Sequence, residues 1–289
     1  MLRFYGWLLV FFFLITGNSV TAQENSFILS EIRFQGNSYF SDEELKQVVK
    51  GYLGKSVSET DIAMIRNDLI DWIVEQGYVT SGAYLPEQEF SDGVLLIQVV
   101  EGGINDVEVE GVGSNLQSYA QVRLAPYLQA PLNLDSLGTG LNVLLEDSRF
   151  NSVDAELIEG DGLGDSFLYL QLEEAPPWSL SVEVGNTNFQ ISDDTSSYRG
   201  AIAIENQNLL GFADEFSLSY EKTAVSDLIQ TRYAVPLGSQ HRWFGEYRNN
   251  ELASDLGFVD LAVLSDIVSV GYQFEAFNEV TEQLLLTVT

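Results

Sequence analysis

Charged side chains recur in the middle of apolar, alternating segments in the C-terminal third of this 289-residue chain. One side of each alternation is apolar, and the other carries small or charged residues. A charge buried without a partner is costly, so we expect water to reach the charged side. The residues predicted to face that water, inside a lumen, are Glu183, Arg199, Glu205 and Arg232. Their chemistry would be to line a polar passage rather than to catalyse a reaction.

No arrangement of residues predicts an enzyme. His241 is the one histidine, and no nucleophile motif accompanies it. Residues 159–165 (EGDGLGD) lack the spacing and the closing Glu of a calcium loop, and residues 111–113 (GVG) lack the third glycine of a dinucleotide fingerprint. The chain has no Cys, which excludes thiol chemistry and cysteine-ligated metals. We therefore predict no catalytic residue, no cofactor and no metal site.

The composition also limits the partners. The chain has 43 acidic and 13 basic residues, a formal net charge of −30. Nucleic acid is excluded as a partner, because binding a phosphate backbone needs a basic face. The apolar fraction of 45% is too high for a disordered acidic chain. Between residues 23 and 175 there are 27 acidic and 7 basic residues, which indicates either a preference for a basic partner or general solubility.

The charged residues lie in segments that predict β-strands from residue 178 onward. The segments are about as long as the nine to eleven residues that a tilted membrane strand needs. Arg and Glu in mid-strand suit a wet lumen better than a packed sandwich core, and Trp and Tyr near strand ends are typical of an interfacial girdle. We predict an antiparallel transmembrane β-barrel over residues 176–289, with a soluble β-sandwich as the alternative.

The sequence stops at Thr289, inside an alternating segment. Seven or eight such strands could close a small barrel. An open edge in lipid leaves unpaired backbone groups, however. We therefore expect residues 176–289 to be the N-terminal part of a barrel that further chain completes.

The first residues predict export. Arg3 is followed by an unbroken apolar run over residues 7–15, and residues 20–22 (VTA) form a small-residue cleavage pattern. We predict a signal peptide over residues 1–22, cut after Ala22. The alternative is an N-terminal membrane anchor, but the run is short for about 30 Å of hydrocarbon.

Residues 23–102 and 103–175 predict one small α+β module used twice, each with the order β-α-α-β-β. In the first module the strands are residues 27–35, 78–85 and 94–100, and helices begin at Ser41 and Ser58. In the second, strands at 104–110, 150–158 and 167–172 surround helices at 114–127 and 133–145. A charged, proline-containing linker over residues 173–177 precedes the predicted barrel.

Two hairpin strands of these modules are candidate edges for strand addition, in which an extended client pairs with unpaired backbone groups. We select residues 78–85 and 150–158. The predicted client-binding residues are Tyr78, Val79, Thr80, Ser81, Tyr84, Phe150, Ser152, Val153 and Ala155. The alternative is that a neighbouring module covers each edge.

Several local motifs carry a family resemblance over roughly residues 27–289. They are residues 32–37 (IRFQGN), 77–80 (GYVT), 100–102 (VEG), 198–200 (YRG), 205–211 (ENQNLLG) with Asp214, and 232–238 (RYAVPLG). Together with the order of modules and strands, the chain resembles the outer-membrane transporters of two-partner secretion, the haemolysin secretion and activation proteins ShlB/FhaC/HecB. The modules resemble POTRA (polypeptide-transport-associated) domains.

The resemblance implies an outer-membrane barrel of about sixteen strands, with the POTRA modules in the periplasm. Such a protein captures a large, unfolded secreted partner and passes it outward without ATP. We expect outer-membrane lipid around the barrel and a monomer. Only residues 23–26 precede the first strand, so we expect no plug helix there. Two alternatives stay open: a factor that assembles other barrel proteins, and a passive porin or adhesin.

Overall fold

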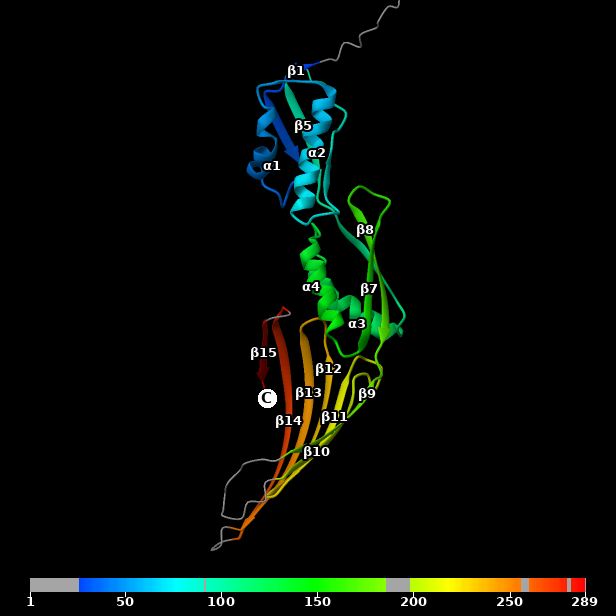
Figure 1. The fold of residues 1–289 in the computed structure, drawn as a ribbon, viewed down its shortest axis with the longest axis vertical. Helices are drawn as coiled ribbons and strands as arrows, with labels where there is room; N and C mark the ends of the chain where they lie inside the picture. The colour runs from blue at the N-terminus through cyan, green and yellow to red at the C-terminus, as the bar shows by residue number, and fades with distance from the viewer. Residues whose placement is uncertain (1–25, 91, 186–197, 256–259, 280–281, 289) are drawn as a thin grey trace, which may run out of the picture.

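The computed structural model describes residues 26–90, 92–185, 198–255, 260–279 and 282–288. The predicted signal peptide and Thr289 lie outside these ranges. The described chain forms an elongated molecule in which two α+β modules are stacked end to end above a curved antiparallel sheet (Figure 1). None of the described helices has the length and apolar character to cross a membrane.

Module 1 follows the predicted order of elements, with one further short strand between its two helices. They are β1 (Phe27–Ile28), β2 (Glu31–Gln35), α1 (Asp42–Val49), the 3-10 turn η1 (Lys50–Tyr52), β3 (Ser56–Val57), α2 (Glu59–Glu75), β4 (Gly82–Tyr84) and β5 (Val94–Val100). Both predicted N-cap serines are confirmed as capping boxes. The Ser58 hydroxyl accepts from the Asp61 N–H, and the Asp61 carboxylate accepts from the Ser58 N–H at 2.8 Å. The Ser58 N–H and then the Ser58 hydroxyl, which both donate to the Asp61 carboxylate, lower the pKa of Asp61.

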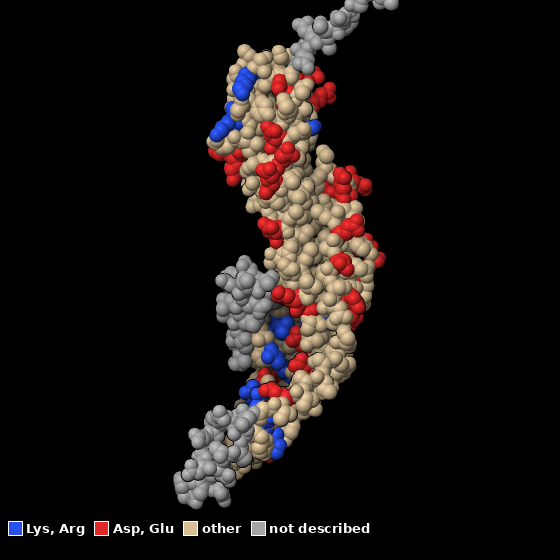
Figure 2. Space-filling view, in the orientation of Figure 1, with Lys and Arg blue, Asp and Glu red and all other residues tan. Residues whose placement is uncertain are grey.

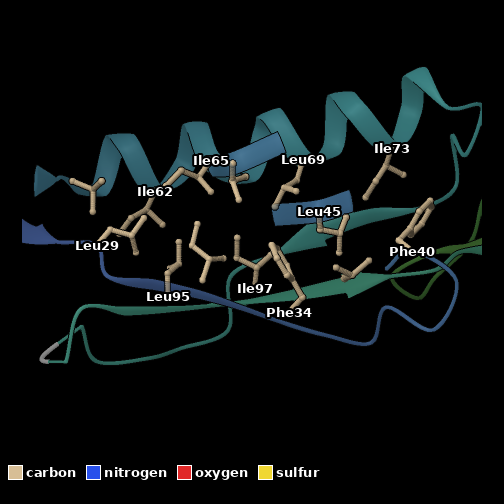
Figure 3. Packing of buried hydrophobic residues seen from close by; sticks show 14 residues of the cluster. Leu29, Phe34, Phe40, Leu45, Ile62, Ile65, Leu69, Ile73, Leu95 and Ile97 are labelled. Carbon is tan, nitrogen blue, oxygen red and sulfur yellow. The ribbon is translucent and has the colours of Figure 1, made fainter. Parts of the chain in front are cut away.

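The predicted strand over residues 27–35 is divided in two. Leu29 turns inward and is fully buried, and the N–H groups of Ser30 and Glu31 both donate to the Gly93 carbonyl, at 2.8 and 3.2 Å. β1 pairs with β3 as a separate ribbon, while β2 lies parallel to β5 at one edge of a three-stranded sheet whose other edge is β4. Figure 3 shows α2 covering this sheet, with Ile65, Leu69 and Ile97 between them.

Module 2 repeats the plan. Its elements are β6 (Gly103–Glu110), α3 (Ser114–Leu124), the 3-10 turn η2 (Ala125–Tyr127), α4 (Leu134–Leu145), β7 (Phe150–Glu159) and β8 (Asp165–Glu174). The sheet order is β6-β8-β7, so β7 is an edge strand. Its hydrophobic core contains Leu116, Leu124, Leu168 and Leu170, and also Ala213 from the chain beyond the linker.

The two modules meet through specific backbone contacts. Asn133 caps α4 by accepting from the Asp135 N–H at 2.9 Å, and its amide donates to the Gln76 carbonyl at the end of α2, at 3.2 Å. The Leu134 N–H donates to the Gly77 carbonyl at 2.9 Å. The N-terminus of α4 therefore lies against the C-terminus of α2, and these hydrogen bonds join the two modules.

Seven strands follow in chain order and pair only antiparallel. They are β9 (Trp178–Gly185), β10 (Arg199–Asn206), β11 (Glu215–Thr223), β12 (Ser226–Pro236), β13 (His241–Asp255), β14 (Asp260–Glu279) and β15 (Glu282–Val288). This confirms the predicted fold class, tandem modules followed by part of an antiparallel barrel. β13 and β14 have 15 and 20 residues, longer than expected. Their ladder continues through polar pairs such as Asn250 and Ser265, where backbone pairing no longer needs hydrophobic alternation.

The capping box of α2 gives a stability prediction for module 1. Ser58→Ala removes the acceptor for the Asp61 N–H and should destabilise the start of α2 by about 1 kcal/mol. Hydrogen exchange of the amides in the first turn of α2 measures this loss. Thr60→Ala, an exposed position in the same turn, is the matched control and should leave exchange unchanged. Equal protection in both variants would contradict the assigned cap.

Candidate functional site

The β7 edge of module 2 contains four of the predicted client-binding residues. Phe150, Ser152, Val153 and Ala155 lie in a strand that pairs with β8 on one side, and the structure gives it no strand partner on the other side within the described residues. Phe150 is buried in the module core, whereas Ala155 is exposed. The register shifts between Phe150 and Ser152, so the strand bends at its start. Most of β7 is thus left with one unpaired backbone side.

The strand predicted over residues 78–85 in module 1 is wrong for most of its length. The strand β4 covers only Gly82–Tyr84, and the preceding residues form a turn after α2. The Tyr78 N–H donates to the Ile73 carbonyl at 3.2 Å, and the Ser81 N–H donates to the Tyr78 carbonyl at 3.0 Å. Helix-type and turn bonds therefore take up backbone groups that an edge strand would leave free.

Each side chain of this turn has a defined place. The Tyr78 hydroxyl donates to the Tyr39 hydroxyl at 2.6 Å, and its ring packs edge-on against Phe40. Partial burial, and then the Tyr39 contact, raise the pKa of Tyr78. Ser81 is buried, and its hydroxyl accepts from the Gly102 N–H at 2.9 Å. Val79 is exposed and Thr80 half-buried. Ser81 thus supports the link between the modules, and client contact stays a prediction for Tyr84 in the β4 edge.

The strand register places all four predicted lumen-facing residues on one side of the large sheet. Arg199 on β10 bridges two neighbouring strands, with Glu183 at 2.9 Å and Glu221 at 3.0 Å. Glu205 lies opposite Ser179 on β9 and Ser217 on β11. Figure 2 shows Lys and Arg side chains gathered along this side of the sheet, below module 2. The side with these charges is called the charged face below.

The opposite side of the sheet is apolar and exposed. Leu180 and Val184 on β9 and Val268 on β14 are 68, 85 and 77% exposed. Pairing places Leu180, Ile204 and Leu218 in one row across three strands. Exposed aliphatic rows opposite paired charges are typical of a sheet with hydrocarbon on one side and water on the other.

Phe244 interrupts the alternation of β13 in the sequence, and the structure gives the reason. The ring lies on the charged face and is only 6% exposed. The Arg232 guanidinium lies over it, 4.3 Å from the ring centroid, and donates to the Gln273 side chain at 2.9 Å. The cation–π contact holds Arg232 against the wall of the sheet.

A cavity of about 430 Å³ separates module 2 from the charged face. Tyr119 and Arg123 of α3 form one wall, and Glu205, Glu215, Arg232 and Arg242 of the sheet are among the residues that form the other. The Arg123 guanidinium donates to the Ser239 carbonyl in the turn between β12 and β13. The space between module 2 and the charged face is therefore polar and lined by side chains of both charges.

Sequence reasoning missed the residues that join module 2 to the sheet. Arg149 is 4% exposed and binds Asp147 and Glu215, both at 2.9 Å, and the Ala213 carbonyl at 2.6 Å. The other oxygen of Glu215 binds Arg242 at 3.0 Å. The only signal for this cluster in the sequence is that Arg149 is one of few cations in a strongly acidic region.

The surroundings of this cluster keep the Tyr119 phenol neutral and the Arg149 guanidinium protonated. Burial raises the pKa of Tyr119, and the neighbouring Asp147 carboxylate raises it further, so the phenol donates to Asp147 at 2.6 Å. Burial opposes the charge of Arg149, but Tyr119, Asp147 and Glu215 outweigh burial and raise its pKa. A guanidinium held between two carboxylates stays protonated and provides several fixed donors.

Two family models match separate parts of the chain. Residues 27–102 match the family described as POTRA domain, ShlB-type. Residues 164–276 match the family described as haemolysin secretion/activation protein ShlB/FhaC/HecB. The first match covers module 1, and the second runs from β8 into β14.

Individual relatives and one solved structure show the same similarity. The outer membrane transporter CdiB of Dickeya dadantii is 26% identical over 79% of this chain and 42% of its own length. The heme/hemopexin transporter protein HuxB of Haemophilus influenzae is 24% identical over 73% of this chain and 37% of its own. The solved structure of CdiB from Escherichia coli has a TM-score of 0.63 at 21% identity, covering 95% of this chain and 52% of that one.

The chain thus spans about half, or less, of the length of these relatives. Within that span, the order of module and strand-rich sheet, the two family matches and the fold of the CdiB structure all agree. Over its first module and its sheet, the chain is therefore similar to the haemolysin secretion and activation proteins ShlB/FhaC/HecB, and its relatives include outer membrane transporters.

Proposed function

We propose that this chain provides the periplasmic modules and the first strands of a translocation pore, which captures an unfolded exported protein and passes it outward without ATP. The chain is an outer-membrane protein whose POTRA modules lie in the periplasm. The observation that carries the proposal is the polar cavity between module 2 and the charged face. Tyr119 and Arg123 line it on the module side, and Glu205 and Arg232 are among the residues that line it on the sheet side.

Capture by strand addition follows from the unpaired backbone side of β7. Its N–H and C=O groups would be paired by a client strand at the cost of little rearrangement. Only an extended client exposes its own backbone groups in the same way, so the edge selects unfolded polypeptide rather than a folded domain. Backbone pairing also tolerates many client sequences, while the exposed side chains, such as Ala155, adjust preference.

Passage needs a wall that does not hold the client. On the charged face, Arg199 is held between Glu183 and Glu221, and Arg232 by Phe244 and Gln273. Charges that are already paired attract a passing charged side chain less strongly than free ones, while still keeping the wall hydrated. Folding of the client outside, at about 5–15 kcal/mol per domain, would supply the free energy for passage without nucleotide hydrolysis.

The edge proposal predicts a client crosslink at β7. The chain has no Cys, so Ala155→Cys in the full-length protein gives a single reactive position. We expect it to form a disulfide with a single-cysteine client arrested during export. Met64→Cys, exposed on α2, is the matched control and should form none.

The same crosslink separates the alternatives. Adducts with one large exported protein support the translocation pore. Adducts with many outer-membrane barrel proteins instead favour an assembly factor, and no adduct at Ala155 favours a porin or adhesin. Equal adducts at positions 155 and 64 would contradict capture at the β7 edge.

The lumen proposal predicts a change in ion selectivity. Arg199→Glu leaves three neighbouring carboxylates on the charged face, so the pore should become more cation-selective, most strongly at low salt where screening is weak. Reversal potentials of the full-length protein in planar bilayers measure this change. Arg199→Lys keeps the charge and should match the parent. An unchanged reversal potential in Arg199→Glu would place this side chain outside the ion path.

A further inference from the structure

The turn between β10 and β11 is part of module 2 in space, although it belongs to the sheet in sequence. Ala213 in this turn is fully buried and packs in the module 2 core with Leu116 and Ala120. Its backbone φ is +56°, a conformation that a non-glycine residue adopts at a cost. Such a conformation persists only where the surroundings fix it, which here means the docking of the turn into the module.

The turn is also shaped by its own side chains. Asp214 is fully buried, and its carboxylate accepts from the N–H groups of Leu210 at 3.0 Å and Phe212 at 3.1 Å. The Asn208 side chain accepts from the Ala213 N–H at 2.9 Å. These bonds form within the turn itself, so the turn packs against module 2 with its shape already fixed rather than as a flexible loop.

Arg149 binds the turn between β10 and β11 to module 2. From a buried position it donates to the Ala213 carbonyl and to Glu215 on the sheet side, and to Asp147 on the module side. Tyr119 of α3 lies under the same guanidinium, 4.9 Å from ring centroid to carbon, and donates to Asp147. A planar guanidinium with several fixed donors joins three segments that a lysine could not hold together.

Resting on the proposed function, we propose that the docked turn makes module 2 and the first barrel strands one rigid body, with Arg149 as its positioning residue. The Arg123 contact with the Ser239 carbonyl forms a second attachment on the far side of the cavity. Because the contacts of Arg149 and Arg123 hold module 2 on both sides of the cavity, the distance between α3 and the charged face stays fixed. The client then passes through a gap of constant size, and module 2 does not swing away from the barrel during export.

The first test uses the full-length outer-membrane protein and a fixed bridge. Arg123→Cys and Ser239→Cys are joined by a short bismaleimide, and export of the client is compared with that of both single variants after the same treatment. We expect the bridged protein to export within about twofold of the single variants. Loss of export on bridging, with the single variants active, overturns the proposal, because it means that module 2 must move.

The second test removes the positioning residue. Arg149→Ala should broaden the distance distribution between spin labels at the exposed positions Leu163 and Leu237. It should also lower export at least tenfold. The bismaleimide bridge between positions 123 and 239 should then restore most of that export. Arg66→Ala, which removes a guanidinium that donates to Asn67 in module 1, is the control and should change neither readout. An unchanged distance distribution in Arg149→Ala overturns the proposal.

The Ala155→Cys client adduct keeps this proposal distinct from the proposed function. In Arg149→Ala, we expect the adduct to form while export fails, since capture at β7 does not need the junction. Absence of the adduct in the parent protein would instead count against capture itself. If Arg149→Ala does not reach the outer membrane, the bridged protein alone still decides whether module 2 moves.

Discussion

A strand edge is tolerable in water and very costly in hydrocarbon, because an unpaired N–H or C=O group finds no partner in lipid. This constraint explains how strands are used along the chain. In the modules, β4 and β7 each have one strand partner among the described residues, and water can satisfy the other side of each. In the large sheet, each described strand between β9 and β15 pairs on both sides. An edge left open in water and a strand paired on both sides in a sheet that faces lipid thus follow from the same backbone chemistry.

The few cations of this acidic chain are placed where they organise structure. The sheet contains five basic residues, and the structure gives each a partner: Arg199 with Glu183 and Glu221, Lys222 with Asp227, Arg232 with Phe244 and Gln273, Arg242 with Glu215, and Arg248 with Glu246. Arg149 repeats the pattern at the junction. Exposed pairs of this kind add little stability. Their effect is to fix where charge lies on the charged face and at the junction.

The sequence predicted features that depend on local chemistry. Ser41 and Ser58 were identified as helix starts because each serine is followed by acidic residues in the first turn. The alternation after residue 178 identified the two faces of the sheet. Features that depend on distant partners were missed. Residues 78–81 have strand-like composition, but the end of α2 and Gly102 hold them in a turn. No local pattern could place Ala213 in the core of a module that ends some forty residues earlier.

The contact between Ser81 and Gly102 has a consequence for how such modules are exchanged between relatives. A Cβ added to Gly102 would lie 1.9 Å from the Thr80 carbonyl oxygen. The place where the turn at Thr80 meets Gly102 therefore tolerates no side chain at position 102. The same Cβ would lie 2.7 Å from the Gly164 carbonyl oxygen in module 2, so module 1 is not a freely portable part. A chimaera remains well packed only if it keeps a glycine at position 102, between the turn at Thr80 and the turn at Gly164.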